Sequence, residues 1–358
     1  MLRLLPALLL LAISSFAQAE QPRVVTTIQP LQQIATAVMD GIAPVEVMLP
    51  PGASPHSYAL RPSDRRMLRS ADRIYWVGPQ LELFLQSLLD GEGTAVALMD
   101  VDGLETRTYP ERRNFQQGNG DQKPAHDGHA GHDHAQEHGH GHKHDHDHKH
   151  EHDGDHSNDH DSYADHGHGG HGGHGGHEHD HDHAPGTLDE HIWLSPTNAQ
   201  VIARFMAADL TELFPDHAEQ LAANLATFEA RLEALDTQLT ERFAPLGDKG
   251  YFVFHDAYGY FEDHYGIKAK GVFTLSHEVQ PGARQVNLLR QQLSESGRVC
   301  VFTEPQFTPR LVNSLTRDLP VEAGELDPLG VGIAVGPEGY IALLQQLADN
   351  LAGCLEQL

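Results

Sequence analysis

The feature that most constrains this chain is an alternation of short apolar segments with helical patterns, which occurs once in each half. The apolar segments are rich in β-branched and aromatic residues, and helix-like stretches separate them. They lie at residues 23–28, 45–50, 73–78 and 94–100, and again at 251–256, 268–275, 298–305 and 321–328. Strands that alternate with helices in this way form parallel sheets. We therefore expect an α/β protein with two lobes, each a parallel sheet flanked by helices.

A long helical pattern joins the two alternating regions. It contains no glycine over more than forty residues, and Pro215 interrupts it before a second helical run begins. We expect residues 196–245 to form a rigid backbone helix that links an N-terminal lobe, residues 20–195, to a C-terminal lobe, residues 246–358. Such a helix would leave a cleft between the lobes and resist large hinge motion.

Residues 118–186 are of low complexity. Between His126 and His183 lie 22 of the 28 histidines, together with 14 acidic residues. This tract has too little apolar surface to offset the entropy of ordering, so we expect a disordered loop. Its imidazoles would bind Zn²⁺, Ni²⁺, Cu²⁺ or Co²⁺ in several loose, exchanging sites, as a reservoir or antenna, and a solubilising spacer is the alternative. The accessory metal-binding histidines are expected to include His138, His140, His142, His144, His146, His148, His150 and His152.

The chain begins like an exported protein. One positive charge, Arg3, precedes an apolar run from Leu4 to Ile13 that is too short to span a bilayer, and a small-residue cleavage pattern ends at Ala19. These features predict a signal peptide over residues 1–19 and a soluble exported product, and a buried N-terminal helix is the alternative. No cysteine follows the cleavage pattern directly, so we expect no lipid anchor.

The net charge limits the classes of partner that this chain can bind, and the cysteines indicate its redox compartment. The formal net charge of −27 argues against nucleic acid or an anionic membrane as a partner. The only cysteines, Cys300 and Cys354, predict one disulfide in an oxidising compartment. It would close a loop of 55 residues and stabilise the fold by about 4 kcal/mol. Two buried free thiols are the alternative, and the absence of a CxxC pair argues against a thiolate metal site.

Three histidines outside the tract occupy positions that favour ligation. His56 and His255 follow apolar runs, and His191 lies in a turn before the long helical pattern. Asp327 follows another apolar run. Ligands of open parallel sheets bind outside the carboxyl ends of the strands, so these four side chains are candidates for one shared site, although their spacing alone does not establish convergence. Three imidazoles and one carboxylate are a complete tetrahedral set for zinc.

The remaining histidines have simpler interpretations. His217 is expected on an exposed helix face, and His264 at the end of a helix, where a cation interacts favourably with the helix dipole. His277 begins a His-Glu pair that lacks the second histidine of the zinc-protease motif, which excludes that class. The sequence also contains no G-x-S-x-G motif and no phosphate-binding glycine loop.

Five sequence blocks together resemble one protein family. They are PPGASPHSYALRPSD, DEHIWLSPTNA, YFVFHDAYGYFEDHYG, CVFTEPQF and GELDPLG, in this order along nearly the whole mature chain. They resemble the zinc-binding proteins of bacterial zinc ABC importers, the cluster A-I or cluster 9 periplasmic solute-binding proteins. The resemblance implies two α/β lobes joined by a long rigid helix, with the metal between them. A histidine-rich insert is another mark of the zinc-importing branch.

The resemblance also implies roles for individual residues. His56, His191 and His255 match the three histidine ligands, and a histidine rather than a glutamate at the third position favours zinc over manganese. Asp327 matches a carboxylate that completes the site in many relatives. Some zinc members carry a glutamate just before the first histidine, where this chain has Pro55. The fourth ligand is therefore expected to be Asp327 or water.

The function that the resemblance implies is transport rather than catalysis. Cys300 and Cys354 match a disulfide of some zinc members, in keeping with the periplasm. We expect a monomeric, non-enzymatic periplasmic protein that captures Zn²⁺ and delivers it to an ABC permease. The alternatives are a free-standing zinc buffer or metallochaperone and a zinc-dependent hydrolase. A nickel or manganese importer component would share the fold.

Overall fold

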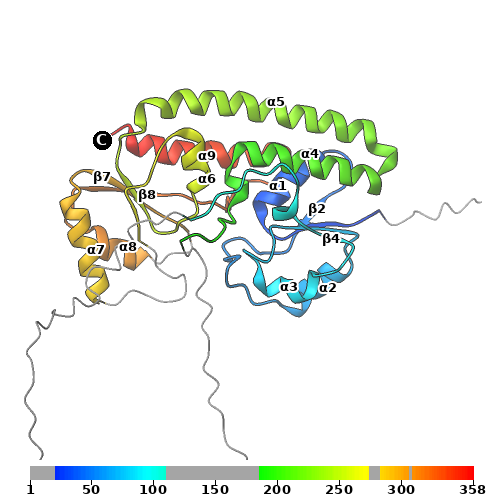
Figure 1. Ribbon diagram of the computed structural model, residues 1–358, viewed down its shortest axis with the longest axis horizontal. Coiled ribbons are helices and arrows are strands. Elements are labelled where there is room, and N and C mark those ends of the chain that lie inside the picture. The colour runs from blue at the N-terminus through cyan, green and yellow to red at the C-terminus, as the bar shows by residue number, and fades with distance from the viewer. Residues whose placement is uncertain (1–20, 110–184, 274–282, 306–308) are drawn as a thin grey trace, which may run out of the picture. The chain divides into compact units, whose positions relative to one another are not determined.

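The N-terminal lobe is built on a four-stranded parallel sheet, as the computed structural model shows (Figure 1). Its strands are β1 (Val24–Thr26), β2 (Val45–Val47), β3 (Arg73–Trp76) and β4 (Ala95–Ala97), in the order β2-β1-β3-β4. Helices α1 (Gln29–Val38), α2 (Pro62–Arg69) and α3 (Leu83–Leu89) connect them. Prolines stand in the first turn of α1 and of α2, where a backbone N–H has no partner within the helix.

The C-terminal lobe repeats this arrangement. Its parallel strands are β5 (Tyr251–Val253), β6 (Gly271–Val272), β7 (Val299–Thr303) and β8 (Val321–Glu325), in the order β6-β5-β7-β8. Its helices are α6 (Gly259–Tyr265), α7 (Ala283–Glu295), α8 (Pro309–Thr316) and α9 (Gly339–Leu355). The expectation of two α/β lobes with parallel sheets is therefore confirmed. In each lobe the first two strands of the chain lie side by side and run parallel. The loops that follow them therefore begin at the same edge of the sheet, the carboxyl edge.

Parts of the chain fall outside this description. The described residues are 21–109, 185–273, 283–305 and 309–358. They belong to one compact unit. The predicted signal peptide over residues 1–19, the eight accessory histidines and His277 lie outside the described residues. No helix among the described ranges is long and apolar enough to cross a membrane.

The stretch 196–245 consists of two helices rather than the single linking helix that we expected. Helix α4 (Pro196–Leu213) begins at Ser195, whose side chain accepts a hydrogen bond from the Asn198 N–H at 3.1 Å. Phe214 then leaves the helical conformation, and a short 3₁₀ turn, η3 (Pro215–His217), leads into α5 (Ala218–Phe243). The cause is Pro215, which has no N–H to continue α4.

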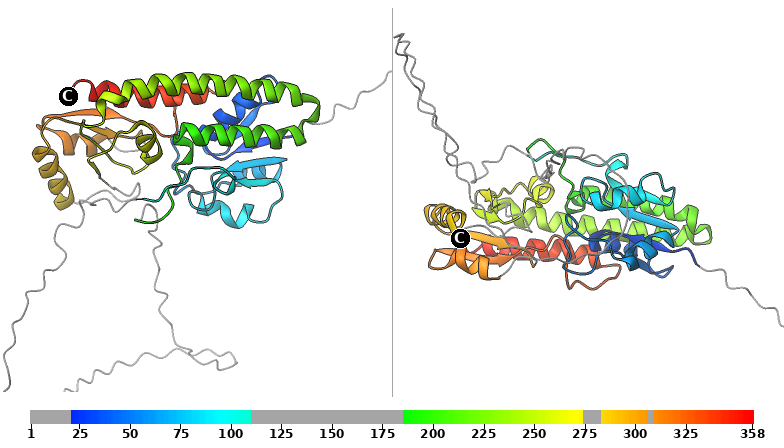
Figure 2. Two further views of the ribbon diagram at one scale, coloured as in Figure 1. Left: turned by 45° about the horizontal axis from the view of Figure 1, so that its top comes forward. Right: turned by 90° about the horizontal axis from the view of Figure 1, so that it is seen from below.

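Helix α5 is the element that joins the lobes. Its 26 residues span about 39 Å at the usual rise of a helix. It packs against α4 and α1 on one side of the linkage and against α6 and α9 on the other. Figure 2 shows α9 lying alongside α5 in both views. The apolar positions that α5 buries recur at helical spacing, from Leu221 and Phe228 to Leu239 and Phe243. One continuous hydrophobic core therefore extends along α5 through both lobes.

A disulfide joins Cys300 on β7 to Cys354 on α9, as the sequence predicted. The two Cα atoms are 6.2 Å apart, which is within the usual range for such a bridge. The bond ties the last helix of the chain to a central strand of the C-terminal sheet. The alternative of two free thiols is therefore wrong.

The loop after β8 connects the two lobes through hydrogen bonds. The indole Nε1–H of Trp193 donates to the Pro328 carbonyl at 2.8 Å, and the Gln29 amide donates to the Gly330 carbonyl at 2.7 Å. Gly330 has a φ of +72°, and a Cβ there would meet the side chains of Ile333 and Leu343 at 3.1 Å. The loop therefore needs glycine at this position to make its turn.

A short ladder lies where the chain enters and leaves the undescribed residues 110–184. The Tyr109 N–H donates to the Thr187 carbonyl and the Gly186 N–H donates to the Tyr109 carbonyl, each at 2.9 Å. Thr108 and Leu188 form an isolated antiparallel bridge. The chain thus enters and leaves residues 110–184 from neighbouring positions.

Candidate metal centre

Three histidines that are far apart in the sequence lie together in the structure. His56 is in the loop after β2, His255 is two residues beyond β5, and His191 immediately precedes the 3₁₀ turn η2 (Ile192–Leu194). Their ring centroids are 4.9 to 5.5 Å apart, and one donor nitrogen of each ring lies within 4.8 Å of the others. The side chains are only 7%, 7% and 1% exposed, respectively. This arrangement leaves room for one cation between three imidazoles.

A carboxylate behind His191 fixes the orientation of its ring. His191 Nδ1 lies 2.9 Å from Asp189 Oδ1, a contact that favours a proton on Nδ1 and directs Nε2 to the side where a metal could bind. Arg107 Nη1 lies 2.5 Å from the other oxygen of Asp189, and its Nε lies 2.8 Å from Asp263 on α6. Burial alone would raise the pKa of Asp189. The hydrogen bonds from His191 and the charge of Arg107 outweigh that effect, and the pKa is lowered.

A second carboxylate holds His255 in the same way. His255 Nδ1 lies 2.8 Å from Glu304 Oε1, which again leaves Nε2 for a metal. The Tyr258 hydroxyl is 3.2 Å from the same oxygen and 3.0 Å from the Leu326 carbonyl. Glu304 directly follows β7, at the same edge of the sheet as His255. Carboxylate–histidine pairs of this kind accompany most histidine ligands in metal sites.

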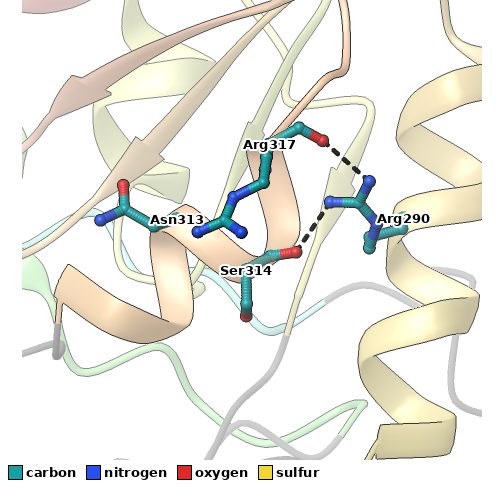
Figure 3. A pocket seen from close by; sticks show the side chains of 4 residues that line it. All are labelled: Arg290, Asn313, Ser314 and Arg317. Atoms are coloured by element: carbon teal, nitrogen blue, oxygen red, sulfur yellow. Dashed lines mark hydrogen bonds between the residues drawn. The ribbon is translucent and has the colours of Figure 1, made fainter.

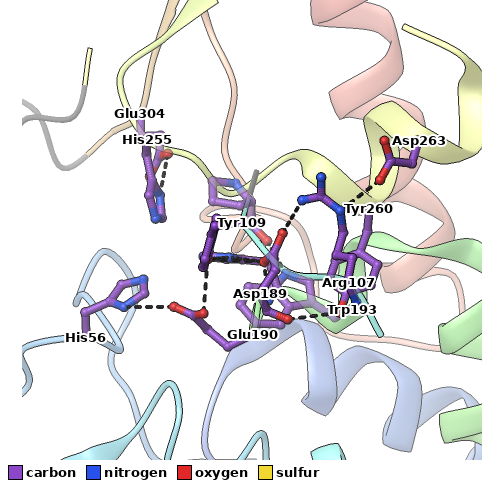
Figure 4. A network of polar contacts seen from close by, with 12 residues as sticks. His56, Arg107, Tyr109, Asp189, Glu190, Trp193, His255, Tyr260, Asp263 and Glu304 are labelled. Carbon is purple, nitrogen blue, oxygen red and sulfur yellow. Dashed lines mark hydrogen bonds and ion pairs between the residues drawn. The ribbon is translucent and has the colours of Figure 1, made fainter. Parts of the chain in front are cut away.

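Glu190 is a buried carboxylate that lies next to His56. It is 3% exposed, and its Oε1 lies 3.7 Å from His56 Nδ1 (Figure 4). Its Oε2 accepts a hydrogen bond from the Tyr109 hydroxyl at 3.0 Å. Burial raises the pKa of Glu190 to about 7. Its donor atoms form a second group with those of Asp189 and His191, all within 4.8 Å of one another.

Asp327 is buried but does not join either group of donor atoms. Its Oδ1 accepts a hydrogen bond from the Leu329 N–H at 2.9 Å, and its Oδ2 accepts one from the Val331 N–H. Burial raises the pKa of this carboxyl despite those bonds. The side chain thus holds the turn after β8, and its expected role as a ligand stays a prediction.

Two other histidines and a hollow between α7 and α8 belong to neither group of donor atoms. His217 is half-buried in η3, and His264 Nε2 lies 2.6 Å from Asp236 Oδ1, which links α6 to α5. A hollow between α7 and α8 is lined by Arg290, Asn313, Ser314 and Arg317 (Figure 3). The Arg290 guanidinium donates to carbonyls at the end of α8, with nearest distances of 2.8 Å. With no imidazole or carboxylate in its lining, this hollow is not a metal site.

Sequence reasoning missed the carboxylates that orient the ligands. Asp189 stands two residues before His191, and Glu304 ends an apolar run at the edge where His255 was expected. Their positions were therefore visible in the sequence. The sequence does not specify the direction in which each side chain points. A carboxylate that supports a histidine and one that could itself bind the metal occupy equivalent places after a strand.

Comparison with known proteins places this centre in a family context. The family model described as "Zinc-uptake complex component A periplasmic", abbreviated ZnuA, matches residues 24–354. The chain belongs to this family. The three clustered histidines and the carboxylates behind them all lie within the matched residues.

Curated relatives match over most of their length. The "High-affinity zinc uptake system protein ZnuA" of Yersinia pestis is 39% identical over 335 residues, which cover 93% of this chain and 91% of the relative. The protein of the same name from Haemophilus influenzae is 41% identical over 332 residues, which cover 93% and 92%. A zinc-bound crystal structure of a ZnuA deletion mutant superposes with a TM-score of 0.61 at 20% identity, covering 92% of this chain and 98% of that one. At that identity the likeness supports the shared fold.

Proposed function

We propose that this protein captures Zn²⁺ in the periplasm and delivers it to an ABC permease for high-affinity zinc uptake. The observation that carries the proposal is the convergence of His56, His191 and His255 from three separate loops. Buried, pre-oriented imidazoles favour tight binding because little side-chain freedom is lost when the ion enters. Membership of the family of zinc-uptake components supports both the metal and the transporter partner.

The donor set favours zinc. Imidazole nitrogen is a preferred ligand of Zn²⁺, and a tetrahedral site needs only four donors. Hard cations such as Mg²⁺ or Ca²⁺ prefer six or more oxygens, which this cluster does not offer. The relatives from Yersinia pestis and Haemophilus influenzae, which are named as high-affinity zinc uptake proteins, support the same metal.

The experiment is a zinc titration of a variant in which His56, His191 and His255 are all replaced by alanine. Competition with a chelator of known affinity separates a tight site from the loose sites expected in the histidine-rich tract. We expect the tight one-to-one site to disappear while weaker binding to the tract remains. His217→Ala and His264→Ala serve as controls that remove a histidine outside the cluster. Tight one-to-one binding by the triple variant would rule the assignment out.

Delivery is tested separately from capture. In a strain that lacks the native protein, the wild-type chain should restore growth in zinc-limited medium and the triple variant should not. Normal growth of the deletion strain without any replacement would favour a free-standing zinc buffer instead. The predicted signal peptide, monomeric state and lack of a lipid anchor stay predictions.

A further inference from the structure

We propose that Glu190, rather than Asp327, is the fourth donor to the metal. This inference rests on the proposed function, because it completes the zinc site formed by the three histidines. Glu190 Oε1 lies 3.7 Å from His56 Nδ1. Two donors that are each about 2.1 Å from a tetrahedral ion are about 3.4 Å apart, so the observed separation is close to that of neighbouring ligands when His56 donates through Nδ1.

The environment of Glu190 fixes one oxygen and directs the other toward the histidines. The Tyr109 hydroxyl donates to Oε2, while Oε1 is on the side of His56 (Figure 4). The side chain is 4% exposed, so water does little to stabilise its charge. A buried carboxylate without a close counter-charge costs several kcal/mol, and a bound dication would remove that cost.

The two other candidate carboxylates are engaged elsewhere. Asp189 is neutralised by Arg107 and hydrogen-bonds to His191 Nδ1, which is the side of the ring away from a metal on Nε2. Asp327 accepts backbone N–H groups of its own turn with both oxygens. Ligation by Asp327 would weaken these bonds, whereas the hydrogen bond that Glu190 accepts from Tyr109 is on Oε2, not on the oxygen that faces His56.

Loading would require one local adjustment. Without a cation, Glu190 groups with Asp189 and His191 and forms no such group with His56 or His255, so its carboxylate must rotate toward the centre of the cluster. Such a rotation is a change of side-chain torsions between staggered rotamers. Three of the four donors would then come from the N-terminal side of α4, and His255 alone from the C-terminal lobe.

The test compares the zinc affinity of Glu190→Gln and Asp327→Asn in the full-length mature chain. The glutamine keeps an acceptor for Tyr109 but removes the anionic donor. We expect Glu190→Gln to weaken the tightest site by at least about 10-fold and Asp327→Asn to leave it near the wild-type value. Glu262→Gln is the matched control, because Glu262 is equally buried but belongs to neither group of donor atoms.

A spectroscopic readout separates ligation from a general effect of charge. With Co²⁺ in place of Zn²⁺, the visible absorption of the wild-type site should change in energy and intensity in Glu190→Gln and stay unchanged in Asp327→Asn. Glu190→Asp keeps the charge but withdraws the oxygen, so it should weaken binding as well. Thermal melts of the metal-free variants identify any loss of folding. A Glu190 variant that melts at the wild-type temperature is folded, and its zinc titration then decides whether Glu190 is a donor.

Each remaining outcome contradicts the proposal. A weakened Asp327→Asn with an unchanged Glu190→Gln would assign the fourth donor to Asp327. Unchanged binding in both variants would assign it to water. In either case the proposed function stands as long as the triple histidine variant loses the tight site, so the two hypotheses fail independently.

Discussion

Glu82 is a fully buried carboxylate at the carboxyl end of β3 that belongs to neither group of metal donors. Its Oε2 accepts hydrogen bonds from the Val77 N–H at 2.8 Å and the Gly78 N–H at 3.3 Å. Burial raises its pKa from about 4.5 to about 7, although these bonds act in the opposite direction. The folded protein therefore holds a proton here between pH 4.5 and 7 that the unfolded chain releases.

This proton predicts how stability depends on pH. Since the native state binds more protons in that window, the free energy of unfolding should fall as pH rises from about 5 to 7 and then level off. One proton contributes a slope of up to about 1.4 kcal/mol per pH unit. Glu82→Gln should make the slope of the metal-free protein shallower by up to that amount, as measured by urea unfolding at several pH values. Glu92→Gln, at an exposed position, should leave it unchanged. Equal slopes in all three proteins would show that Glu82 does not titrate in this way.

The sequence predicted the clustered histidines better than it predicted the carboxylates, Asp189 and Glu304, that hydrogen-bond to two of them. His56 follows β2 of one sheet and His255 follows β5 of the other, so the fold class places each at the carboxyl edge of its own sheet. The meeting of the two edges depends on the linkage between the lobes. The same rule selected Asp327, which also follows a strand. There the local turn uses both oxygens, and this depends on backbone geometry that a residue pattern does not specify.

At the scale of elements, strand and helix positions were predictable and their spatial order was not. Periodicity placed every strand of both sheets, but the order β2-β1-β3-β4 depends on contacts between segments. The interruption at Pro215 was visible in the sequence, yet the packing of α4 against α5 was not expected. Two amphipathic helices that pack on each other and one long amphipathic helix give the same pattern of apolar residues.

The disulfide gives a prediction for the last helix. Replacing Cys300 and Cys354 with alanine should lower the free energy of unfolding by about 2–4 kcal/mol, because the unfolded chain regains the freedom of the closed loop. Zinc affinity should stay near the wild-type value, because neither cysteine contacts a donor group. Guanidinium unfolding and chelator competition on the oxidised wild type and the double variant check both parts. A parallel loss of affinity would indicate that the anchoring of α9 also holds the metal centre.

At the scale of the whole molecule, α5 and the loop after β8 connect the same two lobes. The helix contributes a continuous apolar core, and the loop contributes hydrogen bonds from Trp193 and Gln29. Two linkages of different kinds restrict rotation of one lobe against the other more than a single helix would. The three clustered histidines are therefore held near one another before a metal arrives, in agreement with their low exposure.

The histidine-rich tract predicts a change in stoichiometry without a change in the tight site. Deleting residues 126–183 should lower the number of zinc ions bound per chain, because 22 histidines are removed. The tightest site should keep its affinity, because all donors of the cluster lie elsewhere. Titration of the deletion, and of a variant with a glycine-serine linker of equal length, measures both quantities. Loss of the tight site in both variants would show that the tract supplies a ligand.

The ladder at Tyr109 and Thr187 has a consequence for how this protein can evolve. Because the described residues on either side of 110–184 are adjacent, insertions and deletions between them do not alter the distance that must be spanned. Lengthening such a closed segment carries only a small, slowly growing entropic penalty. Histidines can thus be added to or removed from that segment without changing the backbone positions that hold the buried centre.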